Sequence, residues 1–258
     1  MPLVTLQRRC LSFSPQVPVE QEGKISYPSL PWKGCDSKGL YVCIHGLRGS
    51  PINWRMYTQK ITTEDPTATI FTPSVYKKGN TALSKAADPI LEAIREYLKD
   101  HPSKPIYIIG TSNGARIAAY IENHLTPEEL GKSPLRIISI AGVLQGTKLL
   151  SIFKKYHLSF LARLNPELEK EMAWQSDIAK KTAQEWKEKQ QIWKNTNKDV
   201  RHLFALSPED EQVFPAQAPA APAPADNAEP ETSWLGKALC SSGRMSPSRS
   251  VRRTVQRS

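Results

Sequence analysis

Short apolar runs, separated by polar stretches, recur along the chain up to about residue 206. Runs of this length that are apolar at nearly every position are typical of strands covered on both faces of a parallel sheet. They predict five strands, over Leu40–Ile44, Ala68–Phe71, Pro105–Gly110, Leu135–Ile140 and Val200–Leu206.

The segments between these runs carry apolar residues at three- and four-residue spacing, which predicts helices. We expect helices over Leu83–Asp100 and Asn113–His124, and another that begins at Pro51 with Ser50 as its N-cap. Strands that alternate with helices predict an α/β fold. Because crossover connections are right-handed, we expect a doubly wound, mostly parallel sheet flanked by helices.

The stretch between the fourth and fifth expected strands is too long for a simple crossover. Residues 151–198 are dense in Lys and Glu and predict a helical insertion, in which Asn165 and Pro166 open one helix. Trp186 and Trp193 are seven residues apart, so they fall on one face of a further helix.

Composition is that of an ordinary globular protein, with 39% hydrophobic and 23% charged residues. It excludes collagen, a coiled coil and a wholly disordered chain. No apolar run approaches the roughly 18–20 residues that a membrane-spanning helix needs. A chain of 258 residues can bury a core that needs no disulfide or metal. We expect one domain over residues 1–215 and a separate tail over 216–258.

The tail is Pro/Ala-rich and then Ser/Arg-rich, and it contains six Lys or Arg residues against three acidic residues. Such a composition buries too little apolar area to offset the entropy of ordering, so we expect disorder. The whole chain carries a formal charge of +10. A basic tail can touch nucleic acid or an anionic membrane, although a solvated end is the simpler interpretation.

The cysteines form no C-x-x-C pair and lie near no histidine cluster, which argues against a metal site. Cys43 falls inside an apolar run and is expected in the core.

Reduced thiols and the lack of a secretory signal favour a cytoplasmic location. No glycine-rich phosphate loop is present, so no cofactor is predicted. The sequence does not give the oligomeric state.

The motif most indicative of chemistry is G-x-S-x-G, formed by Gly110, Ser112 and Gly114. It follows an expected strand and opens an expected helix, which is the setting of a nucleophile elbow. Small flanking residues allow the sharp turn that raises a serine hydroxyl above the sheet edge. The alternative is a tight strand–helix turn with an idle serine.

A second loop, His45-Gly-Leu-Arg-Gly-Ser50, follows the first expected strand. Its glycines would let it approach the elbow, so that the N–H groups of Leu47 and Asn113 converge on a developing oxyanion. Together the H-G-x-x-G loop, the G-T-S-N-G elbow and the order of strands and helices resemble the α/β-hydrolase superfamily, particularly its lipase- and esterase-like members.

The resemblance covers about residues 40–215 and implies roles for several of them. It implies Ser112 as nucleophile and Leu47 and Asn113 as oxyanion-hole donors, with His45 and Gly46 as structural parts of the loop. The turn over residues 141–147 partly matches a lipase turn. In the family, an insertion after that turn is often a lid. We therefore expect residues 151–198, with Trp186 or Trp193, to cover the Ser112 pocket, the alternative being a fixed helical decoration.

The loop after the fifth expected strand, residues 207–215, resembles the family's S-x-x-D-x-x-V-P segment. Asp210 matches the triad acid, whereas Glu209 and Glu211 are out of register. In this fold the triad order is serine, acid, histidine. The five histidines of the chain all precede Asp210. We therefore expect a family member that lacks the C-terminal segment with the triad histidine.

Three functions remain open from the sequence. The first is a serine ester hydrolase of the carboxylesterase or lipase type, acting on a small-molecule ester or a lipid and impaired by the missing histidine. The second is a hydrolase-like binding or remnant protein without turnover. The third, a nucleic-acid or membrane-surface binder, rests on the charge of the tail alone and has no accompanying motif.

Overall fold

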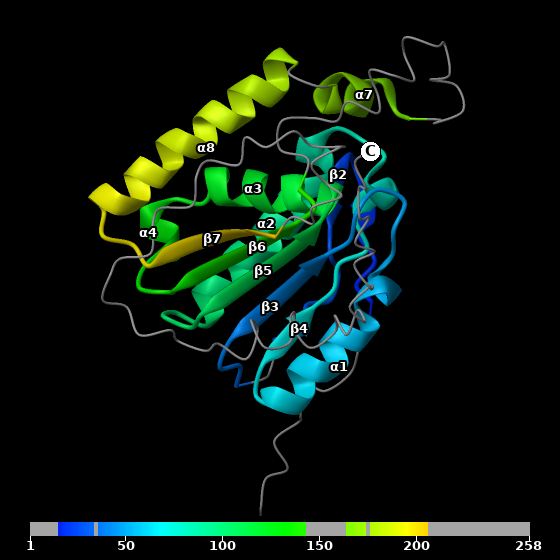
Figure 1. Ribbon diagram of the computed structural model, residues 1–258. Helices are drawn as coiled ribbons and strands as arrows, with labels where there is room; N and C mark the ends of the chain where they lie inside the picture. Colours follow the sequence, from blue (N-terminus) through cyan, green and yellow to red (C-terminus); the bar gives the residue numbers. More distant parts are fainter. Residues whose placement is uncertain (1–14, 34–35, 143–163, 174–175, 206–258) are drawn as a thin grey trace, which may run out of the picture. The chain divides into compact units, whose positions relative to one another are not determined.

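A five-stranded parallel sheet organises the part of the chain that the structure describes. This structure is a computed structural model that describes residues 15–33, 36–142, 164–173 and 176–205. Its strands are β3 (Leu40–Ile44), β4 (Thr69–Phe71), β5 (Ile106–Thr111), β6 (Leu135–Ile140) and β7 (Val200–Ala205), in the order β4-β3-β5-β6-β7 (Figure 1). All four neighbouring pairs are parallel, as expected.

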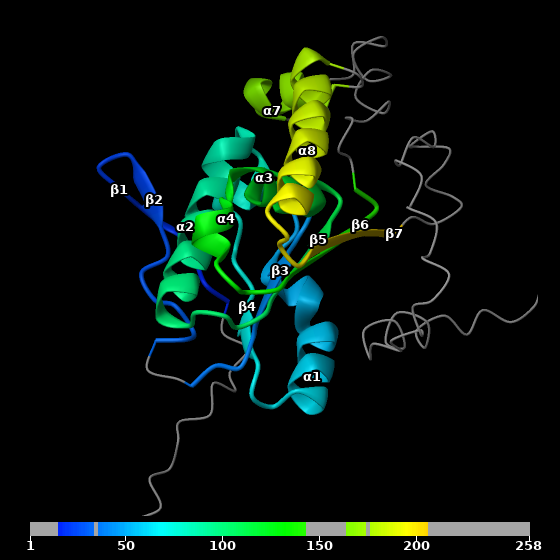
Figure 2. The same ribbon diagram turned by 90° about the vertical axis from the view of Figure 1, so that its left-hand side faces the viewer.

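Helices cover both faces of this sheet. Figure 2 shows α1 on one face and α2, α3 and α8 on the other. The bounds are η1 Pro51–Trp54, α1 Arg55–Glu64, η2 Tyr76–Gly79, α2 Leu83–Asp100, α3 Asn113–His124, α4 Pro127–Leu130, α7 Pro166–Met172 and α8 Asp177–Asn195. A short antiparallel hairpin, β1 (Val19–Gln21) and β2 (Lys24–Ser26), precedes the sheet.

Most element predictions are confirmed because the hydrophobic period is strong where both faces of the sheet are covered. α2 and α3 have the expected bounds, and all five residues of β3 are buried. β5 has the expected length but is shifted by one residue, from Ile106 to Thr111. Asn165 caps α7, with its side-chain oxygen accepting the N–H of Glu167. The expected tail and the loop with Asp210 lie outside the described residues.

The core lies between the sheet and α2. Trp32, Phe71 and Tyr97 pack edge to face, with the Trp32 ring centroid 5.7 Å from Phe71 and 5.4 Å from Tyr97. Cys43 is fully buried on β3, as expected, and this burial raises the pKa of its thiol to about 12. Its environment is therefore that of a core residue and not of a reactive thiol.

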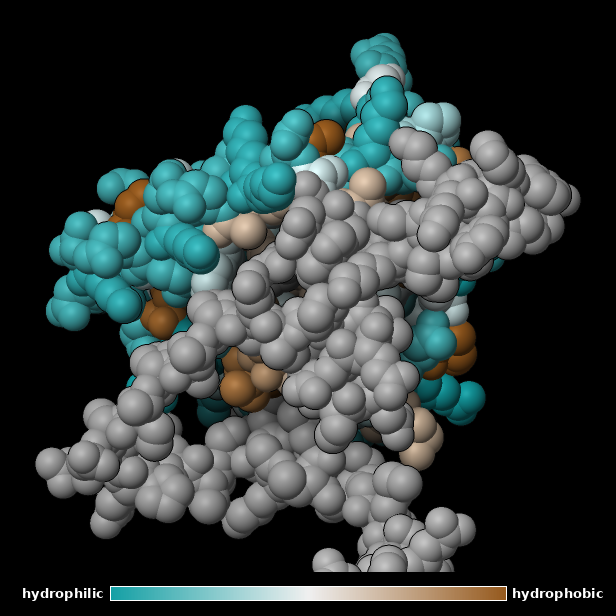
Figure 3. All heavy atoms as spheres, turned by 45° about the horizontal axis from the view of Figure 1, so that its top comes forward, coloured by the Kyte–Doolittle hydropathy of each residue, from teal (hydrophilic) through white to brown (hydrophobic). Residues whose placement is uncertain are grey.

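The tryptophans of α8 pack in a different place from the one we expected. Trp193 belongs to the main core, and the indole N–H of Trp186 donates to Glu122 near the end of α3. Glu122 lies ten residues beyond Ser112, about 15 Å along the helix. The expectation that this tryptophan face covers the Ser112 pocket is wrong, because the face is already used by α3 and β7. The exposed side of α8 is mostly hydrophilic (Figure 3).

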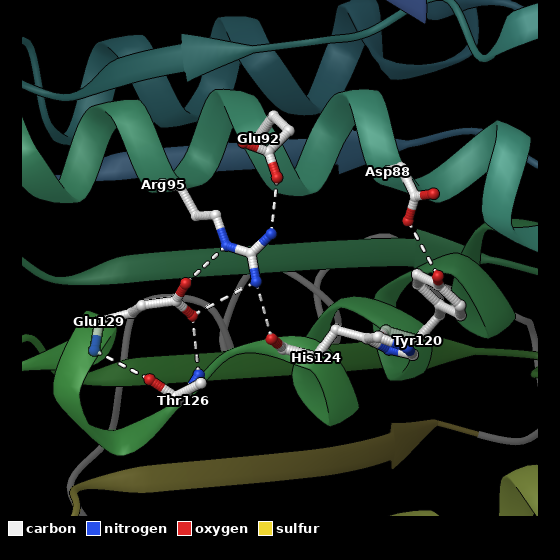
Figure 4. Close-up of polar contacts among 7 residues, drawn as sticks. All are labelled: Asp88, Glu92, Arg95, Tyr120, His124, Thr126 and Glu129. Carbon is white, nitrogen blue, oxygen red and sulfur yellow. Dashed lines mark hydrogen bonds and ion pairs between the residues drawn. The ribbon is translucent and has the colours of Figure 1, made fainter.

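Arg95 joins three helices at the end of the molecule away from the elbow (Figure 4). From α2, its guanidinium donates to the backbone oxygen of His124 at 3.0 Å and pairs with Glu129 at 2.8 Å and Glu92 at 2.6 Å. The contact with His124 satisfies a carbonyl that the end of α3 leaves without an intrahelical donor.

Replacing Arg95 by alanine should lower the free energy of unfolding by about 1–2 kcal/mol, the sum of a charge-assisted bond and a partly exposed ion pair. Urea denaturation measures this change. Arg55→Ala, on the exposed side of α1, is the matched control and should change stability by less than about 0.5 kcal/mol. Equal effects of the two substitutions would show that Arg95 is not a structural tie.

Candidate active site

Ser112 occupies the sharp turn between β5 and α3. Its backbone has φ 52° and ψ −119°, a conformation that L-residues rarely adopt. The Ser112 N–H donates to the Ile140 oxygen at 2.9 Å, which holds the turn at the carboxyl edge of the sheet. The residue is half-buried. Ligands of open α/β sheets bind at this edge.

The two glycines of the motif are required by close backbone packing. A Cβ atom added to Gly110 would lie 2.4 Å from the oxygen of Gly114, and one added to Gly114 would lie 2.3 Å from the oxygen of Ile44. Both distances are well inside van der Waals contact, and both neighbours are backbone atoms. The G-x-S-x-G spacing therefore has a steric cause here: the helix crosses the two strands too closely for any side chain.

The loop after β3 approaches the elbow as we expected. A Cβ atom on Gly46 would lie 3.2 Å from the Ser112 Cβ and 3.7 Å from its Oγ. The Gly49 N–H closes the loop by donating to the Gly46 oxygen at 3.0 Å. Leu47 follows Gly46 directly. Asn113 is the first residue of α3, so its N–H has no acceptor within the helix. These are the two groups from which we expect an oxyanion hole.

His45 holds this loop through both ring nitrogens. Its Nε2 accepts the Val75 N–H at 3.0 Å, so the proton of the neutral ring sits on Nδ1, which donates to the Gly46 oxygen at 2.8 Å. Burial lowers the pKa of the His45 imidazole, the bond to Gly46 opposes this, and the charge of Lys78 lowers it further. A ring engaged in this way fits a structural part and not a general base.

The depressed pKa of His45 predicts a pH dependence of stability. The folded state disfavours the protonated His45 ring, so the pKa of this ring is lower in the folded than in the unfolded protein. The stability that neutral His45 contributes is therefore complete above pH 6.5, the ordinary pKa, and is lost as the pH falls from there to the lower folded pKa. We expect the unfolding free energy of the wild type to fall more steeply between pH 7.5 and 5 than that of His45→Gln, by up to about 1.4 kcal/mol per pH unit. Parallel pH profiles for the two proteins would contradict this role of His45.

A polar network fixes the residue after the nucleophile. The Asn113 side chain donates from Nδ2 to the Gly79 oxygen at 3.3 Å and accepts from Arg116 at 3.0 Å. Arg116 is buried and pairs with Glu171 of α7 at 3.5 Å. Desolvation lowers the pKa of the Arg116 guanidinium, and the Glu171 charge opposes this shift. Glu171 also accepts the Leu83 N–H at 2.9 Å, so α7, α2 and the elbow are joined.

Of the expected insertion, α7 lies beside the loop that follows β3. Leu168 and Met172 on α7 are buried against Leu47. The Asn165 N–H donates to the Asn80 side chain at 2.7 Å, which ties the start of α7 to the segment after η2. Residues 143–163 lie outside the residues that the structure describes, so the lid role of the insertion stays a prediction. Of the two described helices of the insertion, α7 and not α8 is the neighbour of the site.

His202 is fully engaged away from Ser112. Its Nδ1 contacts the Glu122 carboxylate at 2.7 Å and its Nε2 contacts the Ser139 hydroxyl at 2.8 Å, and all three side chains are buried. Among the other described histidines, His101 follows α2 and His124 ends α3, both at the opposite edge of the sheet. Within the described residues, therefore, no histidine is directed at Ser112.

Sequence reasoning missed the contributions of Gly79, Arg116 and Glu171 to this site. Arg116 looks like an ordinary helical residue, and its partner is distant in the chain. No local pattern indicates such a pair. Asp210 and His157 lie outside the described residues, and so does the part of the 141–147 turn after Gly142. In the residues that are described, no group of three His, Cys, Asp or Glu side chains is placed to hold a metal ion.

Comparison with known proteins gives a fold and no close relative. No protein-family model matches the chain, and no curated protein sequence matches it. Among solved structures, phospholipase PlaB from Legionella pneumophila in complex with thio-NAD is 14% identical with a TM-score of 0.50, covering 65% of this chain and 37% of PlaB. Lipase BlEst2 from Bacillus licheniformis, in its propeptide form, is 12% identical with a TM-score of 0.49, covering 66% of this chain and 36% of BlEst2.

The parallel sheet, the tight strand–helix turn at Ser112 and the similarity to PlaB define the α/β-hydrolase fold. The chain spans well under half the length of PlaB. No helix among the described residues is long and apolar enough to cross a membrane.

Proposed function

We propose that the chain is a serine hydrolase of the esterase or lipase type, with Ser112 as its nucleophile and an ester, including lipid esters, as its substrate. The observation that supports this most strongly is the backbone of Ser112, a strained turn bounded by two glycines that admit no side chain. Strain of this kind persists where the surroundings require it, commonly at functional sites. The names of PlaB and BlEst2, a phospholipase and a lipase, agree with this substrate class.

The proposed chemistry is acyl transfer. The Ser112 hydroxyl gives up its proton and attacks the ester carbonyl, and the N–H groups of Leu47 and Asn113 donate to the oxyanion that develops. The ester C–O bond then breaks, the alcohol leaves with a proton, and water hydrolyses the acyl-serine to release the acid. Such donors are effective because they are already oriented before the reaction. In this proposal, Gly46 and the His45 ring position the Leu47 N–H. The start of α3 and the contact between the Asn113 and Arg116 side chains position the Asn113 N–H. The reaction needs no cofactor, and Asp210 is the proposed acid.

This chemistry lacks an identified general base. A serine hydroxyl needs a positioned base near neutral pH, and in the triad that base is a histidine. No histidine follows Asp210 in the 258 residues, and His45 and His202 are engaged elsewhere. A carboxylate of pKa about 4 is a poor substitute. We therefore propose that this chain hydrolyses esters slowly. The engaged histidines favour, as a second candidate, a hydrolase-like binding protein without turnover.

A serine-directed fluorophosphonate probe tests Ser112 as the nucleophile. We expect slow labelling that peptide mapping assigns to Ser112 and that Ser112→Ala abolishes. Ser139→Ala is the matched control, because Ser139 is the described serine that contacts a histidine but is fully buried, and this variant should still label. Labelling that persists in Ser112→Ala would overturn the assignment, and complete inertness of the folded wild type would favour the binding protein.

A further inference from the structure

Three cationic residues lie on two loops that meet beside the elbow. Arg48 belongs to the oxyanion loop, and Lys77 and Lys78 belong to η2; all three are exposed. The loops are joined because the Arg48 N–H donates to the Lys78 oxygen at 2.8 Å. We call Arg48, Lys77 and Lys78 the cationic rim.

The rim is attached to the nucleophile turn as well as to the oxyanion loop. Gly79 follows Lys78, and its oxygen accepts from the side chain of Asn113, the residue after Ser112. A Cβ atom on Gly79 would lie 3.9 Å from the Leu47 Cα. Lys78 is close enough to His45 for its charge to lower the pKa of that imidazole. The rim is therefore within a few residues of both expected oxyanion donors.

The backbone of the rim is unusual for charged residues. Arg48, Lys77 and Lys78 have φ angles of 58°, 48° and 53°, in the left-handed region that glycine adopts more readily. Ser112 also has a positive φ angle, of 52°. The fold thus holds three side chains with positive charge at turns where glycine would be less strained.

Two described carboxylates belong to the networks around the rim. Glu171 pairs with Arg116, and Glu20 accepts from the Tyr76 hydroxyl. Within the described part of the chain, neither Lys77 nor Lys78 forms an ion pair; the Lys77 ammonium lies over the Tyr76 ring, 5.3 Å from its centroid. The two lysine charges are therefore not balanced by an ion pair among the described residues, and they lie on a turn that bonds to Arg48 and to Asn113.

From this arrangement, we infer that the cationic rim binds a phosphate group on the ester presented to Ser112, and so selects phosphate-bearing esters over neutral ones. Lysine ammonium groups are compact, freely rotating donors suited to phosphate oxygens. The inference deepens the proposed function, because it assigns a substrate class to the same site. The phosphate can belong to a lipid headgroup at a membrane surface or to a soluble phosphate ester, and the same side chains would meet it in either case.

Binding of a ligand that cannot be hydrolysed tests the rim independently of turnover. Isothermal titration calorimetry with decyl phosphate below its micelle concentration, against uncharged decyl glucoside, measures the preference of the full chain. We expect decyl phosphate to bind more tightly, and the double variant Lys77→Gln/Lys78→Gln to lose affinity for it by about tenfold, as two exposed charge pairs allow. The free-energy cost of the left-handed backbone is about the same in the wild type and in the double variant, because lysine and glutamine are both L-residues with a side chain.

A charge-matched control separates the rim from the general charge of the protein. Lys132→Gln/Lys180→Gln removes two exposed lysines outside the rim and should bind like the wild type. Ser112→Ala should also bind normally, so failure of Ser112 chemistry and failure of the rim are distinguishable. Equal affinity of the rim variant and the wild type, or an equal loss in the control, would overturn the inference.

Sedimentation with vesicles identifies the source of the phosphate. Rim-dependent binding to phosphatidylglycerol vesicles, and not to vesicles of the phosphate-free lipid digalactosyldiacylglycerol, supports a lipid headgroup. Rim-dependent binding of decyl phosphate without vesicle binding supports a soluble ester.

Discussion

Replacing Gly114 by alanine is expected to destabilise the protein by about 3 kcal/mol or more, because the new methyl group would lie 2.3 Å from the Ile44 oxygen and 2.8 Å from the His45 oxygen. Neither atom can move without distorting β3 or the oxyanion loop. The elbow must open or the helix must shift away from the strand. Urea denaturation, with near-ultraviolet circular dichroism as the probe of packing, measures the loss.

Gly23→Ala provides the control for this substitution. Gly23 has φ 77° and lies between β1 and β2, but a Cβ atom there has no neighbour within 4 Å. Only backbone strain remains, about 1 kcal/mol. If Gly114→Ala is no more destabilising than Gly23→Ala, the packing of α3 against β3 is looser than described, and the steric explanation of the motif fails.

Removing the Glu122 carboxylate is expected to cost about 3–5 kcal/mol, as for other buried charged groups with several partners. This fully buried side chain accepts from Trp186 at 2.7 Å and from Gln190 at 2.6 Å, and it contacts His202 Nδ1 at 2.7 Å. It joins α3 to α8 and β7, so Glu122→Ala leaves the buried His202 ring and the partly buried Trp186 and Gln190 donors without their acceptor. Thermal and urea unfolding measure the loss.

Glu188→Ala is the matched control, because Glu188 is exposed on α8 and bonds only to Gln184 among the contacts described. Its effect should stay below about 0.5 kcal/mol. Glu122→Gln, which keeps the shape, should fall between the two because one amide N–H₂ group would face a donor. A stable Glu122→Ala protein would mean that α8 and β7 are held by apolar packing alone.

The sequence predicted the sheet and the tight strand–helix turn at Ser112 well, for an identifiable reason. Buried strands and the helices α2 and α3 have strong hydrophobic periods that tertiary contacts reinforce. The G-x-S-x-G spacing was informative because Gly110 and Gly114 meet backbone atoms. Local pattern and global packing agree at these positions, and such agreement makes a sequence interpretable.

Reasoning from sequence periodicity failed for α8, because it does not tell which part of the molecule a helical face packs against. The spacing of Trp186 and Trp193 correctly indicated one face of α8, but it contained no information on what that face covers. The position of that face is set by the contact of Trp186 with Glu122, which is more than sixty residues away in the chain. The rim was missed because Gly79 marks the turn in the sequence but does not indicate that Lys77 and Lys78 before it also adopt left-handed backbone.

Chemical rescue by imidazole tests most directly the central claim, a competent Ser112 elbow without its base. Hydrolysis of p-nitrophenyl butyrate is followed with and without added imidazole, and Ser112→Ala corrects for hydrolysis by imidazole itself. We predict Ser112-dependent turnover far below the about 1–10³ s⁻¹ of ordinary enzymes, raised saturably by imidazole that supplies the general base. Ser112-dependent turnover at or above about 1 s⁻¹ without imidazole would contradict the missing base. Identical rates for the wild type and Ser112→Ala at every imidazole concentration would contradict the nucleophile.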